Sequence, residues 1–287
     1  MKKYIICGII VILLIAIVWF LHWQNNEIVI SKIQYKNSKI PSIFDGYKIL
    51  QVSDLHNKEF GKNQSKLVQY TKEINPDIIV ITGDIIDKRR TTSEDLYIGL
   101  EYIRQLNKEY PIYFVTGNHE VWRPKFYPEV KQALLDEGVI ILENEAHEID
   151  INGEKISLLG MNDIAEIDGE YITEKERHKF RKILKGLVNK VGDNFKVLLS
   201  HRPELINIYA EEKVDLTFTG HAHGGQIRLP FTEGLFAPNQ GVLPKYTSGI
   251  HYQNESAMVV SRGLGASIFP FRIFNRPEMV VVTLKNR

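Results

Sequence analysis

Residues 77–84 read DIIVITGD, a run of apolar, β-branched residues that ends abruptly in a glycine and an aspartate. Near-continuous apolar runs of this length are typical of strands in a sheet that is covered on both faces. The chain contains four more runs of the same form: YKILQVSD at 47–54, PIYFVTGN at 111–118, FKVLLSH at 195–201 and VDLTFTGH at 214–221. We therefore expect five buried strands.

Helical patterns lie between the first of these strands, at 64–74, 93–109 and 127–137. Strand and helix in alternation indicate an α/β body with right-handed crossovers. A short strand and a linker are expected between residues 28 and 48. The remaining predicted elements are a charged amphipathic helix at 173–190 and strands at 138–142, 155–160, 258–261 and 278–285.

Each of the five strands ends in side chains of the kind that bind metals. In chain order they are Asp54 and His56, Asp84, Asn118 with His119, His201, and His221 with His223. Functional groups of open α/β sheets gather at the carboxyl ends of the strands, so these side chains should form one dense cluster. A helix cap or a core hydrogen bond would explain any one of these side chains. The same explanation would have to apply independently at the ends of all five strands, which makes a common metal site the better interpretation. Gly83, Gly117 and Gly220 should let the backbone turn tightly there.

The blocks SDLH, TGDIID, GNHE, SH and GHAH, in this order and spacing, resemble the calcineurin-like metallophosphoesterases. The resemblance runs from about Ile49 to His223. It implies a layered α/β/β/α sandwich and a metal-dependent hydrolase that acts on phosphoric ester bonds through a metal-activated water. GGQIRLP at 224–230 and SRGLGASIFPFRIFNRPE at 261–278 resemble, more loosely, a bacterial membrane-associated subgroup that includes enzymes hydrolysing UDP-diacylglucosamine and related phosphodiesters.

Carried over by position, the resemblance implies two divalent metal ions per chain. Asp54, His56 and His223 would hold one ion. Asn118, His201 and His221 would hold the other, and Asp84 would bridge both. Imidazole and amide donors suit borderline first-row metals. Manganese, iron, zinc and magnesium are the candidates, and the sequence does not decide among them. Two such ions about 3.5–4 Å apart can activate a water and hold both oxygens of a displacement at phosphorus.

His119 follows a ligand position and, by the resemblance, is not a ligand itself. The resemblance implies that it protonates the leaving oxygen or stabilises the transition state, with Asp87 orienting its imidazole. A solvent-facing loop carboxylate is the alternative for Asp87. Protein phosphatases of this superfamily would have Asp-Arg-Gly where this chain has Asp87, Lys88 and Arg89, which argues against that activity. Glu120 stands where many members have aspartate, and we expect no effect on ligation.

Residues 4–23 read YIICGIIVILLIAIVWFLHW and contain no acidic, lysine or arginine side chain. As a helix, a stretch of about 20 residues spans about 30 Å, the thickness of the hydrocarbon core of a bilayer. A signal peptide is the alternative, but the apolar run is long and no A-x-A-like cleavage site follows it. Lys2 and Lys3 precede the span and the next basic residue is Lys32. The positive-inside rule therefore predicts a single-pass cell-membrane protein with its catalytic domain outside the cytoplasm.

The bulk composition limits the partners. The formal net charge of the 287 residues is +1, which argues against a nucleic-acid partner. The only cysteine, Cys7, excludes an intramolecular disulfide and a thiolate metal site. The expected partners are a small-molecule or lipid-linked phosphoester and the bilayer, through residues 4–23, and no protein partner is evident. Candidate substrate contacts are Gln226, Arg228 and Arg272, the last in a segment, 267–276, that either packs on the domain or faces lipid.

We therefore expect a membrane anchor at 1–25, a linker and first strand at 26–46, and a calcineurin-like phosphoesterase domain at 47–287. The expected function is that of a membrane-anchored phosphodiesterase or pyrophosphohydrolase with a binuclear metal centre, acting on a lipid-linked or cell-envelope phosphoester. The alternatives are a nuclease or nucleotide phosphodiesterase of the same superfamily and a non-catalytic membrane-anchored binding protein. All seven ligand positions are filled, which argues against the last.

Overall fold

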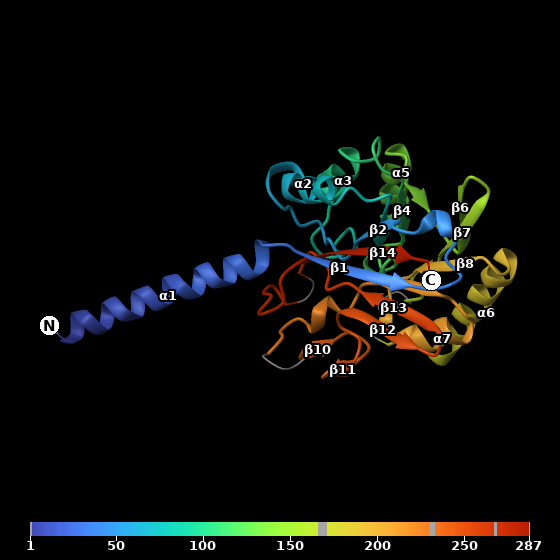
Figure 1. Ribbon diagram of the computed structural model, residues 1–287. Coiled ribbons are helices and arrows are strands. Elements are labelled where there is room, and N and C mark those ends of the chain that lie inside the picture. The colour runs from blue at the N-terminus through green and yellow to red at the C-terminus, as the bar shows by residue number, and fades with distance from the viewer. Residues whose placement is uncertain (1, 166–170, 230–232, 267–268, 287) are drawn as a thin grey trace.

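The computed structural model describes residues 2–165, 171–229, 233–266 and 269–286. Two six-stranded sheets lie face to face, and helices cover the outer face of each sheet (Figure 1). The layers therefore run α/β/β/α, which confirms the fold class expected from the sequence.

The first sheet has the strand order β1-β14-β2-β3-β4-β5. Strands β2 to β5 run parallel, β14 runs antiparallel to β2, and β1 runs parallel to β14. The outer face is covered by α2 (Ser65–Ile74), α3 (Leu96–Arg104) and α5 (Tyr127–Asp136). The strands are β1 (Val29–Lys36), β2 (Lys48–Val52), β3 (Ile78–Thr82), β4 (Ile112–Val115), β5 (Ile140–Ile141) and β14 (Glu278–Lys285).

The second sheet has the order β12-β13-β9-β8-β7-β6, with four parallel strands between two antiparallel edges. Helices α6 (Glu174–Val191) and α7 (Ile206–Glu211) cover it, and Thr173 caps α6 by accepting the N–H of Glu176. The strands are β6 (Glu145–Ile151), β7 (Glu154–Gly160), β8 (Phe195–Leu199), β9 (Leu216–Thr219), β12 (Gly249–Gln253) and β13 (Ser256–Val260). Smaller elements are α4 (Asn118–Val121), β10 (Phe236–Ala237), β11 (Gly241–Val242) and the 3-10 turns Ser42–Phe44, Lys62–Gln64, Pro203–Leu205 and His223–Gly225.

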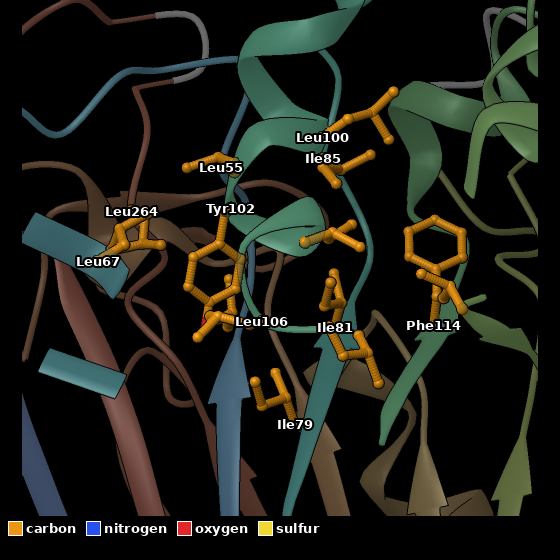
Figure 2. Close-up of a cluster of buried hydrophobic side chains, with 14 of the residues drawn as sticks. Leu55, Leu67, Ile79, Ile81, Ile85, Leu100, Tyr102, Leu106, Phe114 and Leu264 are labelled. Carbon is orange, nitrogen blue, oxygen red and sulfur yellow. The ribbon is translucent and has the colours of Figure 1, made fainter. Parts of the chain in front are cut away.

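Central strands such as β3 and β4 are almost entirely apolar because each buries both of its faces. On β3, Ile79 and Ile81 pack under the helices with Tyr102 and Leu106, as Figure 2 shows. Val80, between them, points to the other side and packs between the two sheets. Because successive side chains of a strand alternate in direction, each such strand contributes to two hydrophobic layers. Burial of one aliphatic side chain contributes about 1.5–3 kcal/mol, so these layers supply most of the stabilisation.

The sequence did not predict the edge strands β6 and β12. Their side chains alternate between exposed and partly buried positions, which weakens the apolar run on which the prediction relied. The helix predicted at 93–109 is shorter, since α3 spans only Leu96–Arg104. It begins late because Thr92 and Asp95 form a side-chain hydrogen bond of 2.9 Å in a turn that precedes the helix.

Helix α1 (Lys2–Asn26) projects away from the two sheets and leads into β1 (Figure 1). Its most apolar window has a mean hydropathy of 3.1, and the helix is long and apolar enough to cross a membrane. By length and composition it fits either a membrane anchor or a signal sequence.

Candidate metal centre

The seven predicted ligand residues converge at one edge of the two sheets. Each follows the carboxyl end of β2, β3, β4, β8 or β9, and every one is at most 4% exposed. The two sheets are joined at this edge by hydrogen bonds from His201 Nδ1 to Thr82 O (2.7 Å) and from Gln51 Nε2 to Thr219 O (2.8 Å). Strands from different sheets can therefore contribute side chains to one buried cluster.

Asp84 lies at the centre of the cluster. Its Oδ2 atom is 3.7 Å from His56 Nε2 and 3.3 Å from His201 Nε2. Its Oδ1 atom accepts the backbone N–H of His119 at 2.8 Å, which fixes the direction of the carboxylate. One oxygen therefore faces imidazoles from both sheets.

On one side of Asp84, ligand atoms of Asp54, His56, Asp84 and His223 all lie within 4.8 Å of one another. His223 Nε2 is 3.3 Å from Asp54 Oδ1 and 3.1 Å from His56 Nε2. On the other side, His201 Nε2 is 3.1 Å from Asn118 Oδ1, and the rings of His201 and His221 are 5.0 Å apart.

The hydrogen bonds of the imidazoles fit a cation. His56 Nδ1 faces Ile86 O at 3.2 Å and His201 Nδ1 faces Thr82 O at 2.7 Å, so each Nδ1 carries the proton and donates it. Each Nε2 then turns a lone pair inward, the usual arrangement of a metal-bound histidine. Burial by itself would lower the pKa of His201, but the carboxylate of Asp84 outweighs it and raises that pKa to about 10. The carboxylates therefore favour positive charge at this Nε2, whether from a proton or from a metal ion that takes the place of the proton.

The backbone is strained at the predicted ligands themselves. Five of the seven residues have left-handed φ values between 47° and 64°: Asp54, His56, Asp84, His221 and His223. Such conformations cost of order 1 kcal/mol or more for residues with a Cβ and persist where the surroundings impose them. Gly117 and Gly220 serve close approach rather than turning, because a Cβ would lie 2.2 Å from Asp84 Oδ1 or from Asp54 Oδ2 respectively.

His119 lines the cavity that opens over Asp84, and its Nδ1 accepts the backbone N–H of Lys88 at 3.0 Å. The proton of the neutral ring is therefore on Nε2, which lies 4.0 Å from Asp84 Oδ2. Asp87 Oδ2 is 4.0 Å from His119 Nδ1, beyond a hydrogen bond. Asp87 instead accepts the backbone N–H of Arg89 at 2.9 Å and the guanidinium of Arg90 at 2.8 Å, so it shapes the loop that contacts His119.

The same cavity has a volume of about 420 Å³. The described side chains around it include two cations, Lys88 and Arg89, and the aromatic rings of Trp122, Tyr171 and Phe236. The ammonium of Lys88 lies 3.9 Å from the centre of the Trp122 ring.

The three candidate substrate contacts are not among the described residues that line this cavity. Arg228 donates to Ser248 Oγ at 2.9 Å and to Glu233 Oε2 at 3.0 Å, and Gln226 is partly buried beside it. Arg272 is 2% exposed, donates to Gly265 O and lies 3.4 Å from His223 Nδ1. Arg272 therefore contacts the cluster of predicted ligands from the protein interior and not from the cavity. Ser267 and Ile268, from the same predicted segment, lie outside the described residues.

Glu120 has a role that sequence reasoning missed. It is fully buried, and its carboxylate accepts the backbone N–H groups of Gly117 (2.7 Å), Asp84 (2.8 Å) and Ile86 (3.2 Å). Burial and the nearby Asp84 raise its pKa to about 7. Glu120 thus fixes the loops after β3 and β4 to each other. Its position directly after His119 in GNHE was the available signal.

Arg202 and Asp163 form a second support that the sequence did not reveal. Both are buried, and two guanidinium nitrogens of Arg202 contact Asp163 at 2.7 and 3.0 Å. Arg202 Nη1 is 3.5 Å from His221 Nε2. The only sequence signal was the position of Arg202 next to His201.

Residues 47–225, more than half of the chain, match the family model of the calcineurin-like phosphoesterases. The uncharacterized metallophosphoesterase YkuE of Bacillus subtilis (strain 168) is 32% identical over 256 residues, which cover 88% of this chain and 83% of that protein. Phosphodiesterase YaeI of Escherichia coli (strain K12) is 25% identical over 243 residues, which cover 83% of this chain and 82% of that protein.

Among solved structures, TT1561 of Thermus thermophilus aligns over 76% of this chain and 90% of its own, with a TM-score of 0.51 and 14% identity. This likeness supports the two-sheet fold. The family match and the buried cluster of carboxylates and imidazoles supply the chemistry. The chain belongs to the calcineurin-like phosphoesterase family and is a metal-dependent phosphoesterase hydrolase with a binuclear metal site.

Proposed function

We propose that the protein is a membrane-anchored phosphodiesterase that acts on a lipid-linked or cell-envelope phosphoester. The observation that carries this proposal is the point where α1 leaves the domain. Val29, just after α1, pairs with Glu278 at the start of β14, and Val280 of β14 pairs with Gln51 near the carboxyl end of β2. The helix therefore departs from the sheet edge at which the metal centre opens. A bilayer that holds α1 would lie on the side of the catalytic cavity.

For the metal centre we propose two ions. A first ion would be held by Asp54, His56 and His223, a second by Asn118, His201 and His221, and Asp84 Oδ2 would bridge them. Its position between His56 and His201, at 3.7 and 3.3 Å, supports the bridging role. When bound, two such ions lower the pKa of a water and neutralise charge on the phosphoryl oxygens.

His56, Asp87 and His119 also bring ligand atoms within 4.8 Å of one another. We do not assign an ion to this group, because both Nδ1 atoms are engaged by backbone groups, Ile86 O and Lys88 N.

His119 would act on the leaving group. Its Nδ1 accepts the N–H of Lys88, so Nε2 carries the proton, and Nε2 lies 4.0 Å from Oδ2 of Asp84, which lines the same cavity. From there it could donate its proton, or a hydrogen bond, to the leaving oxygen. Asp87 would set the position of His119 through the loop of residues 87–90.

The cavity suits a phosphodiester with a bulky apolar or aromatic substituent. Arg89 is exposed in its rim, and Lys88 is partly buried. They could neutralise phosphate charge, while Trp122, Tyr171 and Phe236 offer apolar surface to the rest of the substrate. The name of the relative YaeI, a phosphodiesterase, supports a diester over a monoester.

Aromatic side chains surround the end of α1. Phe269, Phe271 and Phe274 are 39%, 46% and 53% exposed, and the Phe274 ring lies 5.5 Å from that of Phe20 in α1. Exposed aromatic rings at the end of an apolar helix are typical of a membrane interface. They support residues 1–25 as an anchor and 47–287 as a catalytic domain close to the bilayer, and Lys2 and Lys3 favour its location outside the cytoplasm.

The substrate class is tested on the full chain in detergent micelles with Mn²⁺. Two p-nitrophenyl phosphodiesters, one of a long-chain alcohol and one of methanol, are compared with p-nitrophenyl phosphate and a dinucleotide. We expect the highest kcat/KM for the long-chain diester. Equal values for the long-chain and methyl diesters would overturn the lipid assignment. Faster cleavage of the dinucleotide would favour the nuclease alternative.

Arg89→Ala and Arg228→Ala test whether the rim of the cavity binds the phosphate, since Arg89 lines the cavity and Arg228 does not. Arg89→Ala should raise KM for the diesters about tenfold, because one charge-assisted phosphate contact is worth about 1.5 kcal/mol. Arg228→Ala, outside the cavity, should leave KM within about twofold by the same arithmetic. If both variants change KM equally, the rim assignment is wrong.

The orientation is tested by adding protease to intact cells whose outer boundary is permeable. The domain should be digested while a cytoplasmic marker stays intact. Protection equal to that of the marker would overturn the extracytoplasmic location.

A further inference from the structure

The last turn of α1 is built into the domain, unlike the rest of the helix. The side chains from Tyr4 to Trp19 are exposed, whereas Gln24 is only 3% exposed. Its Oε1 atom accepts the backbone N–H of Asn275 at 3.3 Å. A polar, buried end on an otherwise apolar helix indicates a specific contact with the 269–276 segment rather than a loose tether.

Asn25 makes the central contact. Its side-chain Oδ1 accepts the N–H of Arg272 at 2.9 Å, and its Nδ2 donates to the carbonyl of the same residue at 3.3 Å. The Asn25 carbonyl accepts Lys58 Nζ. This carbonyl is among the last four of α1, which lack partners within a helix, and a cation is favoured at the negative end of the helix dipole.

These contacts continue to the proposed ligands of the first ion. The guanidinium of Arg272 donates to Gly265 O at 2.5 Å, and Gly265 N donates to Asp54 O at 2.7 Å. Asn275 Nδ2 donates to His223 O at 2.7 Å. Lys58 lies two residues after His56 in the same loop.

The ligands proposed for the second ion have other described partners. His201 is held by Thr82 O, and the ring of His221 faces Arg202 and Asn239. None of these partners belongs to α1 or to the 269–276 segment.

We infer that Asn25, supported by Gln24, is a positioning residue for the first metal ion, so that the end of the membrane anchor forms part of the metal centre. The inference rests on the two-ion assignment proposed above. It predicts that loosening the last turn of α1 weakens the binding of one metal ion and leaves the binding of the other unchanged.

The adjacent residue provides a matched control. The side chain of Asn26 has described hydrogen bonds only to His22, within α1. Asn25→Ala and Asn26→Ala therefore alter the same helix turn by the same chemistry, and only the first removes a contact with the domain. Asn25→Asp keeps the acceptor for Arg272 N and loses the donor.

The measurement is a stepwise Mn²⁺ titration of the metal-free full chain in detergent, together with the thermal unfolding midpoint. Loss of a residue that supports a metal ligand weakens the affinity for the metal by about 10–100-fold. For Asn25→Ala we expect about tenfold weaker binding of one of the two Mn²⁺ equivalents and unchanged binding of the other. Asn25→Asp should fall between Asn25→Ala and the unaltered chain, and Asn26→Ala should match the unaltered chain. Combined with His223→Asn, Asn25→Ala should cause no further loss.

Two results would overturn the inference. One is equal affinities in Asn25→Ala and Asn26→Ala. The other is an equal weakening of both ions that follows a lowered unfolding midpoint, because this is the result of a merely structural contact. Binding of fewer than two ions by the unaltered chain would instead overturn the metal assignment itself, and the inference with it.

Discussion

The two halves of the metal centre are supported in different ways. The proposed second-ion half, with Asn118, His201 and His221, is held from within the two sheets. His201 donates to Thr82 O across the sheet interface, and buried Arg202, paired with Asp163, stands beside His221. The proposed first-ion half, with Asp54, His56 and His223, is held in part by other loops of the site, since Ile86 O faces His56 Nδ1 and the Asp54 carboxylate accepts the N–H of His221. It has additional contacts outside the sheets, with Gly265, Asn275 and, through Arg272, the end of α1.

The difference separates a rigid half from an adjustable one. Contacts between paired strands form together with the core, so the second-ion half should be as stable as the fold. Contacts with residues 263–266 and 269–276 depend on the connection between β13 and β14. Changes to that segment or to the end of α1 should therefore weaken binding of the proposed first ion more than binding of the second.

The largest expected effect comes from the residue that the two halves share. Asp84→Asn should lose more than one equivalent of metal per chain and nearly all activity, because Asp84 Oδ2 faces both His56 and His201. Elemental analysis and circular dichroism measure the metal content and the fold. Asp150→Asn, on the surface strand β6, is the control. Full metal occupancy in Asp84→Asn would remove the bridging role.

The next effect concerns turnover with both ions retained. His119→Asn should lower kcat by about 10²–10⁴ for a poor leaving group, the range typical of a general acid. The loss should be smaller with p-nitrophenolate, which needs little protonation, and metal content should stay normal. His201→Asn should lose metal and activity together. Equal losses for both leaving groups in His119→Asn would instead indicate charge stabilisation.

The third effect is weaker binding of one metal ion, caused by a substitution beside the proposed first-ion ligands. A Cβ at residue 265 would lie 2.3 Å from Leu55 O and 2.9 Å from His56 Cβ, so Gly265→Ala must displace the His56 loop. We expect about 10- to 100-fold weaker binding of one ion, as for loss of an outer partner of a ligand. Gly186→Ala in α6, where the added methyl would meet no atom within 4 Å beyond its chain neighbours and the backbone of its own helix, is the control. Equal weakening of both ions would break the comparison between the halves.

The smallest effect is expected in the rigid half. Arg202→Lys keeps the charge beside Asp163 and loses the paired contacts at 2.7 and 3.0 Å. One ion should bind about tenfold more weakly, the lower end for an outer partner. Combined with Gly265→Ala, the two losses should fall on different ions in a metal titration. If both substitutions weaken the binding of the same ion, the two halves of the metal centre are not supported independently.

Much of this molecule follows from local sequence patterns. An apolar run such as DIIVITGD predicts a strand because burial on both faces requires apolar side chains at every position. The ligand-type residues after Val52, Thr82 and Thr219 could be predicted to meet, because parallel strands bring their carboxyl ends to one edge. The long apolar helix α1 could be predicted because residues 4–23 form an uncharged run of the length that crossing a bilayer requires.

Other features depend on the tertiary structure alone. The pairing of β1 with β14 brings Asn25 beside Arg272, residues that are 247 positions apart in the chain. No local pattern encodes that contact, because it depends on which strands share an edge. The same holds for Glu120, whose carboxylate accepts the N–H of Asp84, 36 positions away in the chain, as well as that of Gly117. The sequence by itself determined which residues could bind metal, since side-chain chemistry is local. Only the tertiary structure decided what holds each of them in position, since burial and hydrogen bonding join residues that are distant in the chain.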